Sequence, residues 1–233
     1  MMAQGRSSLA KLVQNSTETS RVFAGYVKSS SSSVVTSAIR SMRAASHRFE
    51  SWQKPLGRTA LFMHASIKTA MYVASRPAKD ENTDKAKEWL GWVDSERCLM
   101  LAMMADVADE GMCLTRLLDN EDVDTASLNS EVLLFIRKVD ALFGESERCL
   151  NMFGCTSVML DLLKEHVVWH VNDNSRSIGF EHGVPRDIVD RCIQRMRSYV
   201  VLAHAALAAE FPSFEVSQVT WVTLKSCRSF CCC

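Results

Sequence analysis

The chain has 233 residues, of which 47% are hydrophobic and 23% are charged, and its formal net charge is zero. Nine glycines and four prolines are too few for a collagen-like or Pro/Gly-rich disordered protein, and they argue against a β-sandwich or barrel, which needs frequent turns. The hydrophobic content supports a buried core, so we expect one large folded domain or two small ones.

Charge is distributed unevenly along the sequence. Residues 1–79 carry twelve basic and two acidic side chains, a net charge of +10, whereas residues 80–165 carry eight basic and nineteen acidic side chains, a net charge of −11. A basic, Ser-rich first third is typical of a surface for anionic phosphates of lipid or nucleic acid, or for an import receptor. The alternative is that the two parts neutralise each other within one fold.

Two amphipathic helices are predicted in this basic region, on either side of a five-serine break at Ser29 to Ser33. In the first, apolar side chains share one face and the charged ones the other; the apolar face holds Leu9, Leu12, Val13, Phe23, Tyr26 and Val27. In the second, over residues 35–52, Arg40, Arg43 and His47 oppose a stripe of Val35, Ala38, Ile39, Met42, Ala45, Phe49 and Trp52, with Arg48 on the flank.

Such helices, basic on one face and aromatic on the other, are typical of segments that lie in a membrane interface. They equally describe two surface helices of a bundle. The aromatic residues of the region are predicted on the faces away from the arginines, which favours a lipid surface over base stacking and argues against nucleic acid as the partner.

Further helices are predicted along the rest of the chain. A mostly apolar helix over Thr59–Ser75 ends at Arg76-Pro77, and the pattern resumes at Trp89 and continues to an acidic break at Asp119 to Asp124. We expect further helices over Val132–Phe143, ending at Gly144, and over Glu147–Val171, bent near Gly154, with a loop over 172–184 and a helix from Pro185 to Ala209.

The predicted fold is therefore all-α, a membrane-associated bundle of amphipathic and short hydrophobic helices. Its parts are a basic amphipathic region (1–79), an acidic central region (80–171), and a C-terminal hydrophobic hairpin with a cysteine tail (185–233). No window of 18 residues is cleanly apolar, so we expect interfacial association or short, sheltered helices rather than a polytopic membrane protein.

The nine cysteines include no Cys-x-x-Cys pair, which argues against a disulfide framework and against structural zinc. The last three residues, Cys231, Cys232 and Cys233, do not form a CaaX prenylation box. They are candidate S-acylation sites beside a membrane; the alternative is an unmodified terminus.

One cluster is a candidate metal site. Glu165, His166 and His170, with Asp161 one helical turn earlier, would share one helix face, but the order of the residues differs from the metalloprotease motif. Ordinary surface histidines are the alternative, and we favour it. Phosphate-binding, dinucleotide-binding and nucleophile-elbow motifs are absent from the sequence, so we expect a protein that is not an enzyme and needs no cofactor or metal.

The order of these segments resembles the peroxin-11 family of peroxisomal (glycosomal) membrane proteins, which promote organelle elongation and division. The residues that carry the resemblance are an N-terminal helix (8–27), the Ser/Arg-rich segment 37–49, a central helix (96–117), a helix pair (135–165) and a closing hydrophobic hairpin (194–230). The resemblance implies that Arg40, Arg43 and Arg48 contact lipid phosphates while Ile39, Met42, Phe49 and Trp52 enter the acyl boundary.

From the charge, the amphipathic helices and this resemblance we expect a protein that shapes a peroxisomal (glycosomal) membrane. The expected partners are anionic membrane lipid, further copies of the chain in a homo-oligomer and the organelle-division machinery. One alternative is a mitochondrial helical protein whose residues 1–45 are a cleaved transit peptide, since such peptides are also Arg/Ser-rich. Another is a soluble helical adaptor that binds a basic partner through the acidic centre.

Overall fold

The computed structural model describes residues 13, 16–30, 50–77, 80–120, 122, 124–151, 154–171 and 174–212, without the side chains of residues 30 and 50–54. These residues form ten helices and one β-hairpin, which confirms the predicted helical fold. In chain order the elements are α2 (Thr17–Ser30), α3 (Glu50–Leu61), α4 (Met63–Ala74), α5 (Glu81–Trp92), α6 (Ser95–Glu110), α7 (Met112–Leu118), α8 (Thr125–Phe143), α9 (Arg148–Asn151), α10 (Cys155–Leu162), β1 (Val167–Val171), β2 (Asn174–Ile178) and α11 (Arg186–Glu210).

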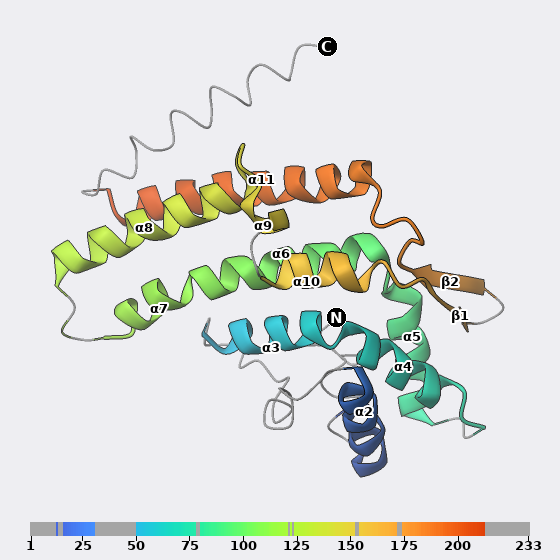
Figure 1. Cartoon of the computed structure of the whole chain (residues 1–233). Coiled ribbons are helices and arrows are strands. Elements are labelled where there is room, and N and C mark those ends of the chain that lie inside the picture. Colours follow the sequence, from blue (N-terminus) through green and yellow to red (C-terminus); the bar gives the residue numbers. More distant parts are fainter. Residues whose placement is uncertain are drawn as a thin grey trace.

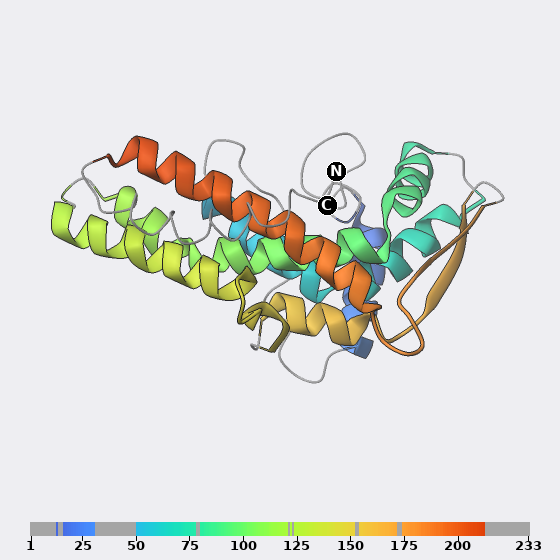
Figure 2. The same ribbon diagram turned by 90° about the horizontal axis from the view of Figure 1, so that it is seen from above.

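The helices are stacked in layers around α6 (Figures 1 and 2). The long helices α8 and α11 lie side by side and form one outer layer, and both contact α6. Helices α3 and α10 pack on other sides of α6, while α2 and α5 pack against α4. The hairpin lies at the end of the molecule next to α5 (Figure 1).

Three helices begin with the same local device, an aspartate at the N-cap. The carboxylates of Asp80, Asp94 and Asp124 accept hydrogen bonds of 2.8–2.9 Å from the third amide of α5, α6 and α8, respectively. Each cap satisfies one of the amides that a helix start leaves without a backbone partner.

A main core draws residues from every part of the described chain. Its largest fully buried side chains include Phe23 of α2, Met63 of α4, Trp89 of α5, Leu99 of α6 and Phe143 of α8. A second, smaller cluster of Leu114, Val132 and Ile136 packs where α7 and α8 meet, against partly buried residues at the end of α11. The N-terminal, central and C-terminal regions of the chain therefore share one packed interior.

Two predicted helices are wrong in part. The helix predicted over Thr59–Ser75 is the pair α3 and α4, interrupted at Phe62, and α3 begins at Glu50. The helix predicted over Glu147–Val171 is replaced by α9, α10 and strand β1, and the predicted loop over 172–184 contains strand β2.

The hairpin is held to the helices by its inner face. In the antiparallel register Val167 pairs with Ile178 and Trp169 with Arg176. Trp169 is 3% exposed, and its indole Nε1–H donates to the carbonyl of Leu90 at 3.3 Å. The β-branched valines of β1 suit a strand of which one face is buried, and this tertiary packing overrides the helical spacing of the sequence.

Candidate functional site

Most of the residues predicted to bind lipid lie outside the described residues. These are Ile39, Arg40, Met42, Arg43, Arg48 and Phe49, and the candidate acylation sites Cys231, Cys232 and Cys233 lie outside as well. Trp52 belongs to helix α3, but its side chain is not described. What the structure does describe is the pair of helices on either side of the segment: α2 ends at Ser30 and α3 begins at Glu50.

The predicted amphipathic helix before the serine break exists as α2, and its apolar face is buried inside the protein. Phe23 and Val27 are each 1% exposed, and the Phe23 ring packs edge-on against Phe62, with 6.3 Å between ring centroids. Arg21 and Lys28 lie exposed on the opposite side. The two-sided pattern is confirmed, but the apolar side is not available to lipid because it belongs to the core.

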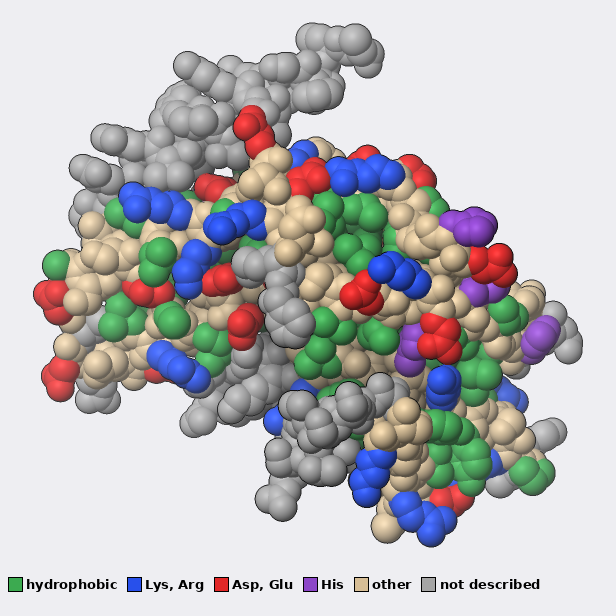
Figure 3. Space-filling model, viewed as in Figure 1, with side chains coloured by type: hydrophobic (Ala, Val, Ile, Leu, Met, Phe, Trp, Pro, Cys, Tyr) green, Lys and Arg blue, Asp and Glu red, His purple; other side chains and the backbone are tan. Residues whose placement is uncertain are grey.

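Glu18, one of the two acidic residues of the basic region, fastens α2 to the end of α4. Its carboxylate pairs with the guanidinium of Arg76 at 2.7 Å and accepts a hydrogen bond from the Tyr72 hydroxyl at 2.8 Å. The same guanidinium lies over the Tyr72 ring, 5.0 Å from its centroid. Figure 3 shows Lys and Arg side chains gathered at the lower end of the molecule, over α2.

The candidate metal cluster is not assembled. His166 and His170 are exposed residues on and next to strand β1 rather than neighbours on one helix face, and Asp161 instead pairs with Lys164 at 2.7 Å. Glu165 contacts residues of α4: its carboxylate lies 3.1 Å from Nδ1 of His64 and 3.8 Å from Nζ of Lys68. The part of the chain that the structure describes contains no group of three or more His, Cys, Asp or Glu placed to hold a metal ion.

His64 is a buried histidine that the sequence did not single out as part of a site. Burial lowers its pKa, and the neighbouring Glu165 carboxylate opposes that effect. These contacts of Glu165 link α4 to the turn after α10. Lys68 and His64 of the N-terminal region therefore both contact an acid of the central region.

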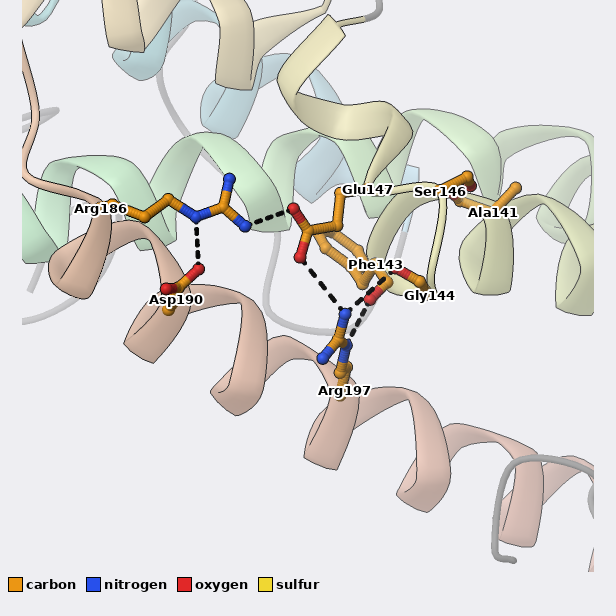
Figure 4. A network of polar contacts seen from close by, with 8 residues as sticks. All are labelled: Ala141, Phe143, Gly144, Ser146, Glu147, Arg186, Asp190 and Arg197. Carbon is orange, nitrogen blue, oxygen red and sulfur yellow. Dashed lines mark hydrogen bonds and ion pairs between the residues drawn. The ribbon is translucent and has the colours of Figure 1, made fainter. Parts of the chain in front are cut away.

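Arginines of α11 pair with two carboxylates of the acidic central region, Glu147 and Glu96. Glu147, in the turn between α8 and α9, bridges Arg186 at 2.6 Å and Arg197 at 3.4 Å. Arg197 also donates to the carbonyls of Phe143 and Gly144, which end α8, and Asp190 holds the other side of Arg186 (Figure 4). Glu147 has a positive φ of 42°, an uncommon conformation for a residue with a side chain.

A second carboxylate anchors the N-terminal half of α11 on α6. Glu96 contacts Arg191 at 3.3 Å and Arg195 at 2.5 Å. Further along, His204 of α11 is 2% exposed and its Nε2 lies 3.4 Å from Asp140 of α8. Burial lowers the pKa of His204 and raises the pKa of Asp140. Glu96, Glu147 and Asp140 are therefore already paired within the protein. In the alternative of a soluble adaptor, these three acids would not be free to bind a basic partner.

Four of the five described thiols are poor nucleophiles because they are largely buried. Burial raises the pKa of Cys98, Cys149 and Cys155 to about 12 and that of Cys192 to about 11, so these thiols stay protonated and weakly nucleophilic at neutral pH. Cys113 on α7 is exposed.

A cavity of about 490 Å³ lies between α5 and the hairpin. Asp84 and Glu88 line it together with Lys87 and Arg176, so both signs of charge face the same space. The backbone of Gly91 leaves open space where a side chain would project. The balanced charges give no strong field for one class of ion.

Apolar side chains are exposed at several points of the surface. Leu202 of α11 is 70% exposed, and Leu61, Met104, Leu118 and Leu134 are each 41–48% exposed. Within the described ranges, none of the helices combines the length and the apolar composition needed to cross a bilayer.

These features define an all-α protein with one shared core, ion pairs between α11 and acids of the central region, and exposed basic side chains on α2. No protein-family model matches the chain, and neither curated proteins nor solved structures give a match. The resemblance to peroxin-11 proteins therefore stays a prediction from the order and spacing of the segments.

Proposed function

We propose that the chain is a non-enzymatic peroxisomal (glycosomal) membrane protein that promotes organelle elongation and division. Residues 31–49 carry Arg40, Arg43 and Arg48 with no acidic residue, in a pattern that alternates between basic and apolar faces. In this account they insert as a helix into one leaflet of an anionic membrane and favour curvature. Homo-oligomers and the organelle-division machinery remain proposed partners.

The main support for the proposal is that residues 31–49 connect two helices that are both packed into the fold. The helix before it, α2, buries Phe23 and Val27 against α4, and the helix after it, α3, packs on α6. Both ends of the basic segment therefore leave from one packed body, so membrane binding by the segment would hold the whole protein at the surface.

Two energetic terms favour binding of the segment to an anionic membrane. Each arginine near an anionic surface contributes about 1 kcal/mol, and burying an apolar side chain such as Phe49 contributes about 1.5–3 kcal/mol. The exposed Arg21 and Lys28 of α2 add to the basic field next to the segment. The conformational entropy lost when the segment becomes ordered opposes these terms.

Flotation of the full chain with vesicles tests the proposal. The full chain is needed because α2 and α3 depend on α4 and α6 for their packing. We expect recovery with anionic vesicles, little with neutral ones, and loss of recovery in Arg40→Glu/Arg43→Glu and in Phe49→Glu. Leu134→Glu, an exposed leucine on α8, is the matched control and should float like the wild type. Equal recovery with neutral and anionic vesicles would overturn the proposal. Recovery of the Arg40→Glu/Arg43→Glu and Phe49→Glu variants equal to that of the wild type would also overturn it.

The structure bears on the transit-peptide alternative. Cleavage after residue 45 would remove α2 and with it the buried Phe23 and Val27 and the Glu18–Arg76 ion pair. The mature protein would then expose the part of the core that α2 covers, which argues against cleavage. A mass measurement of the cellular protein distinguishes the two, because an intact N-terminus excludes the cleaved form.

A further inference from the structure

The C-terminal half of α11 presents two very different sides. Toward the protein it buries Met196, Val200 and His204, each 3% exposed or less. Away from the protein it exposes an uncharged face, called here the outer face of α11, with Tyr199 at 43% and Leu202 at 70% exposure. The other exposed members of this face are small: Ser198, Ala205, Ala206 and Ala209.

This face is bounded by opposite charges. Arg195 lies seven residues before Leu202 and Glu210 lies eight residues after it, which places them about 10 Å and about 12 Å along the helix axis on either side. The Arg195 side chain is 60% exposed although it contacts Glu96, and Glu210 is exposed at the last position of α11. Along the helix, the large Tyr199 comes before Leu202, and the small Ala205, Ala206 and Ala209 come after it.

We propose that the outer face of α11 binds the same face of a second copy of the chain, antiparallel, about a two-fold axis near Leu202. In that arrangement Leu202 meets Leu202, and Tyr199 of each copy packs over Ala205 of the other. Arg195 of each copy lies beside Glu210 of the other. One patch thus supplies both halves of a self-complementary interface, as two-fold symmetry requires.

Two physical arguments favour a second copy over an unrelated partner. The small residues allow two helix axes to approach to about 8–10 Å, the distance of packed helix pairs. The end charges attract only in the antiparallel orientation, because a parallel pair would place Arg195 beside Arg195 and Glu210 beside Glu210. A single helix pair buries less than the roughly 1,200 Å² of standard interfaces, so we expect a concentration-dependent dimer.

This inference rests on the proposed function in one respect, because it specifies the interface of the proposed homo-oligomer. It uses only described residues of α11, and it can fail in lipid-free solution while flotation on vesicles succeeds. Sedimentation of the full chain without lipid, over a range of concentrations, tests it. We expect a reversible dimer in the wild type, and in Leu202→Glu a Kd weaker by about tenfold or more, since the change buries a charge at the centre of the interface. Leu134→Glu is the matched control and should leave the Kd unchanged.

A charge exchange tests the orientation. Glu210→Arg should weaken the dimer by placing like charges together, and adding Arg195→Glu should restore it; thermal unfolding checks the loss of the internal Arg195–Glu96 contact. A monomer at every concentration would overturn the proposal, as would a dimer that survives Leu202→Glu. A dimer that forms only after truncation at Pro212 would also overturn it, because the chain's own last residues would then occupy the face.

Discussion

Asp106 of α6 caps the start of α10 through Thr156, a residue 50 positions further along the chain. The buried carboxylate accepts hydrogen bonds from the Thr156 amide at 2.9 Å, from the Thr156 hydroxyl and from the Cys155 amide at 2.7 Å. A β-carbon on Gly154 would lie only 2.8 Å from the same carboxylate, so a larger residue there would displace the Asp106 side chain from the cap. This contact connects α6 to the segment that precedes the hairpin.

Removing this cap should destabilise the protein. In Asp106→Ala two amides lose their partner within the interior, which costs about 1–3 kcal/mol of unfolding free energy, and Asp106→Asn should lose less because one oxygen can still accept. Urea unfolding measures the difference, with Asp109→Ala on the same helix for comparison. Equal stability of Asp106→Ala and the wild type would contradict the cap.

Helix α2 should behave as part of the core. Phe23→Ala should lower the unfolding free energy by about 3–5 kcal/mol, as expected for a buried aromatic residue, whereas Arg21→Ala on the exposed side should change it by less than about 0.5 kcal/mol. Chemical unfolding of both variants makes the comparison. A small effect of Phe23→Ala would mean that α2 does not pack on the fold.

Replacing Arg197 should lower the unfolding free energy more than replacing Arg186, although both arginines hold α11 on the fold. Both contact Glu147, but Arg197 also donates to the carbonyls of Phe143 and Gly144 and is 39% exposed against 61% for Arg186. Replacing Arg197 by Ala removes the donor to the Phe143 carbonyl, whereas the Gly144 carbonyl still accepts from the Glu147 amide. We expect a loss of about 1–3 kcal/mol of unfolding free energy, against less than about 1 kcal/mol for Arg186→Ala. Unfolding measurements that rank the two variants in the reverse order would contradict this assignment.

Stability should fall as the solution becomes acidic below the ordinary histidine pKa of 6.5. Burial lowers the pKa of both His64 and His204, so the unfolded chain binds more protons than the folded one between 6.5 and the lowered values. The raised pKa of Asp140 acts in the opposite sense at lower pH. Urea unfolding at pH 7.5 and pH 5.5 should show a smaller pH effect in His204→Gln than in the wild type; identical pH effects would exclude a contribution from His204.

Of the five described cysteines, Cys113 should be alkylated first. Its side chain is exposed, whereas burial keeps Cys98, Cys149, Cys155 and Cys192 protonated. Peptide mapping after brief treatment with iodoacetamide gives the order. Early modification of Cys149 or Cys98 would show that the interior opens more readily than the packing indicates.

The sequence predicts those parts of the fold that depend on local signals. Pro185 directly precedes α11 and Gly144 directly follows α8, as the sequence predicts. A side chain at Gly144 would collide with the backbone carbonyl of Asp140. The sequence does not predict the hairpin because His166 and His170 have a helical spacing of four residues. The contact that favours the strand, Trp169 against Leu90, joins residues 79 positions apart.

Contacts between distant segments likewise decide which parts of the candidate site the sequence does not predict. The amphipathic pattern of residues 17–30 predicts that one face of the helix is buried. It does not show whether that face packs against lipid or against the side chains of α4. The pairing of Glu96 and Glu147 with arginines of α11 depends on tertiary folding, so a count of charges by region could not reveal it.

Hydrogen exchange of the full chain on vesicles tests the central claim most directly. If the basic segment between α2 and α3 enters the membrane interface, the amides of residues 35–49 exchange more slowly with anionic vesicles than with neutral vesicles or in buffer, while those of α6 are unchanged. Unchanged exchange of residues 35–49 on anionic vesicles would contradict the account.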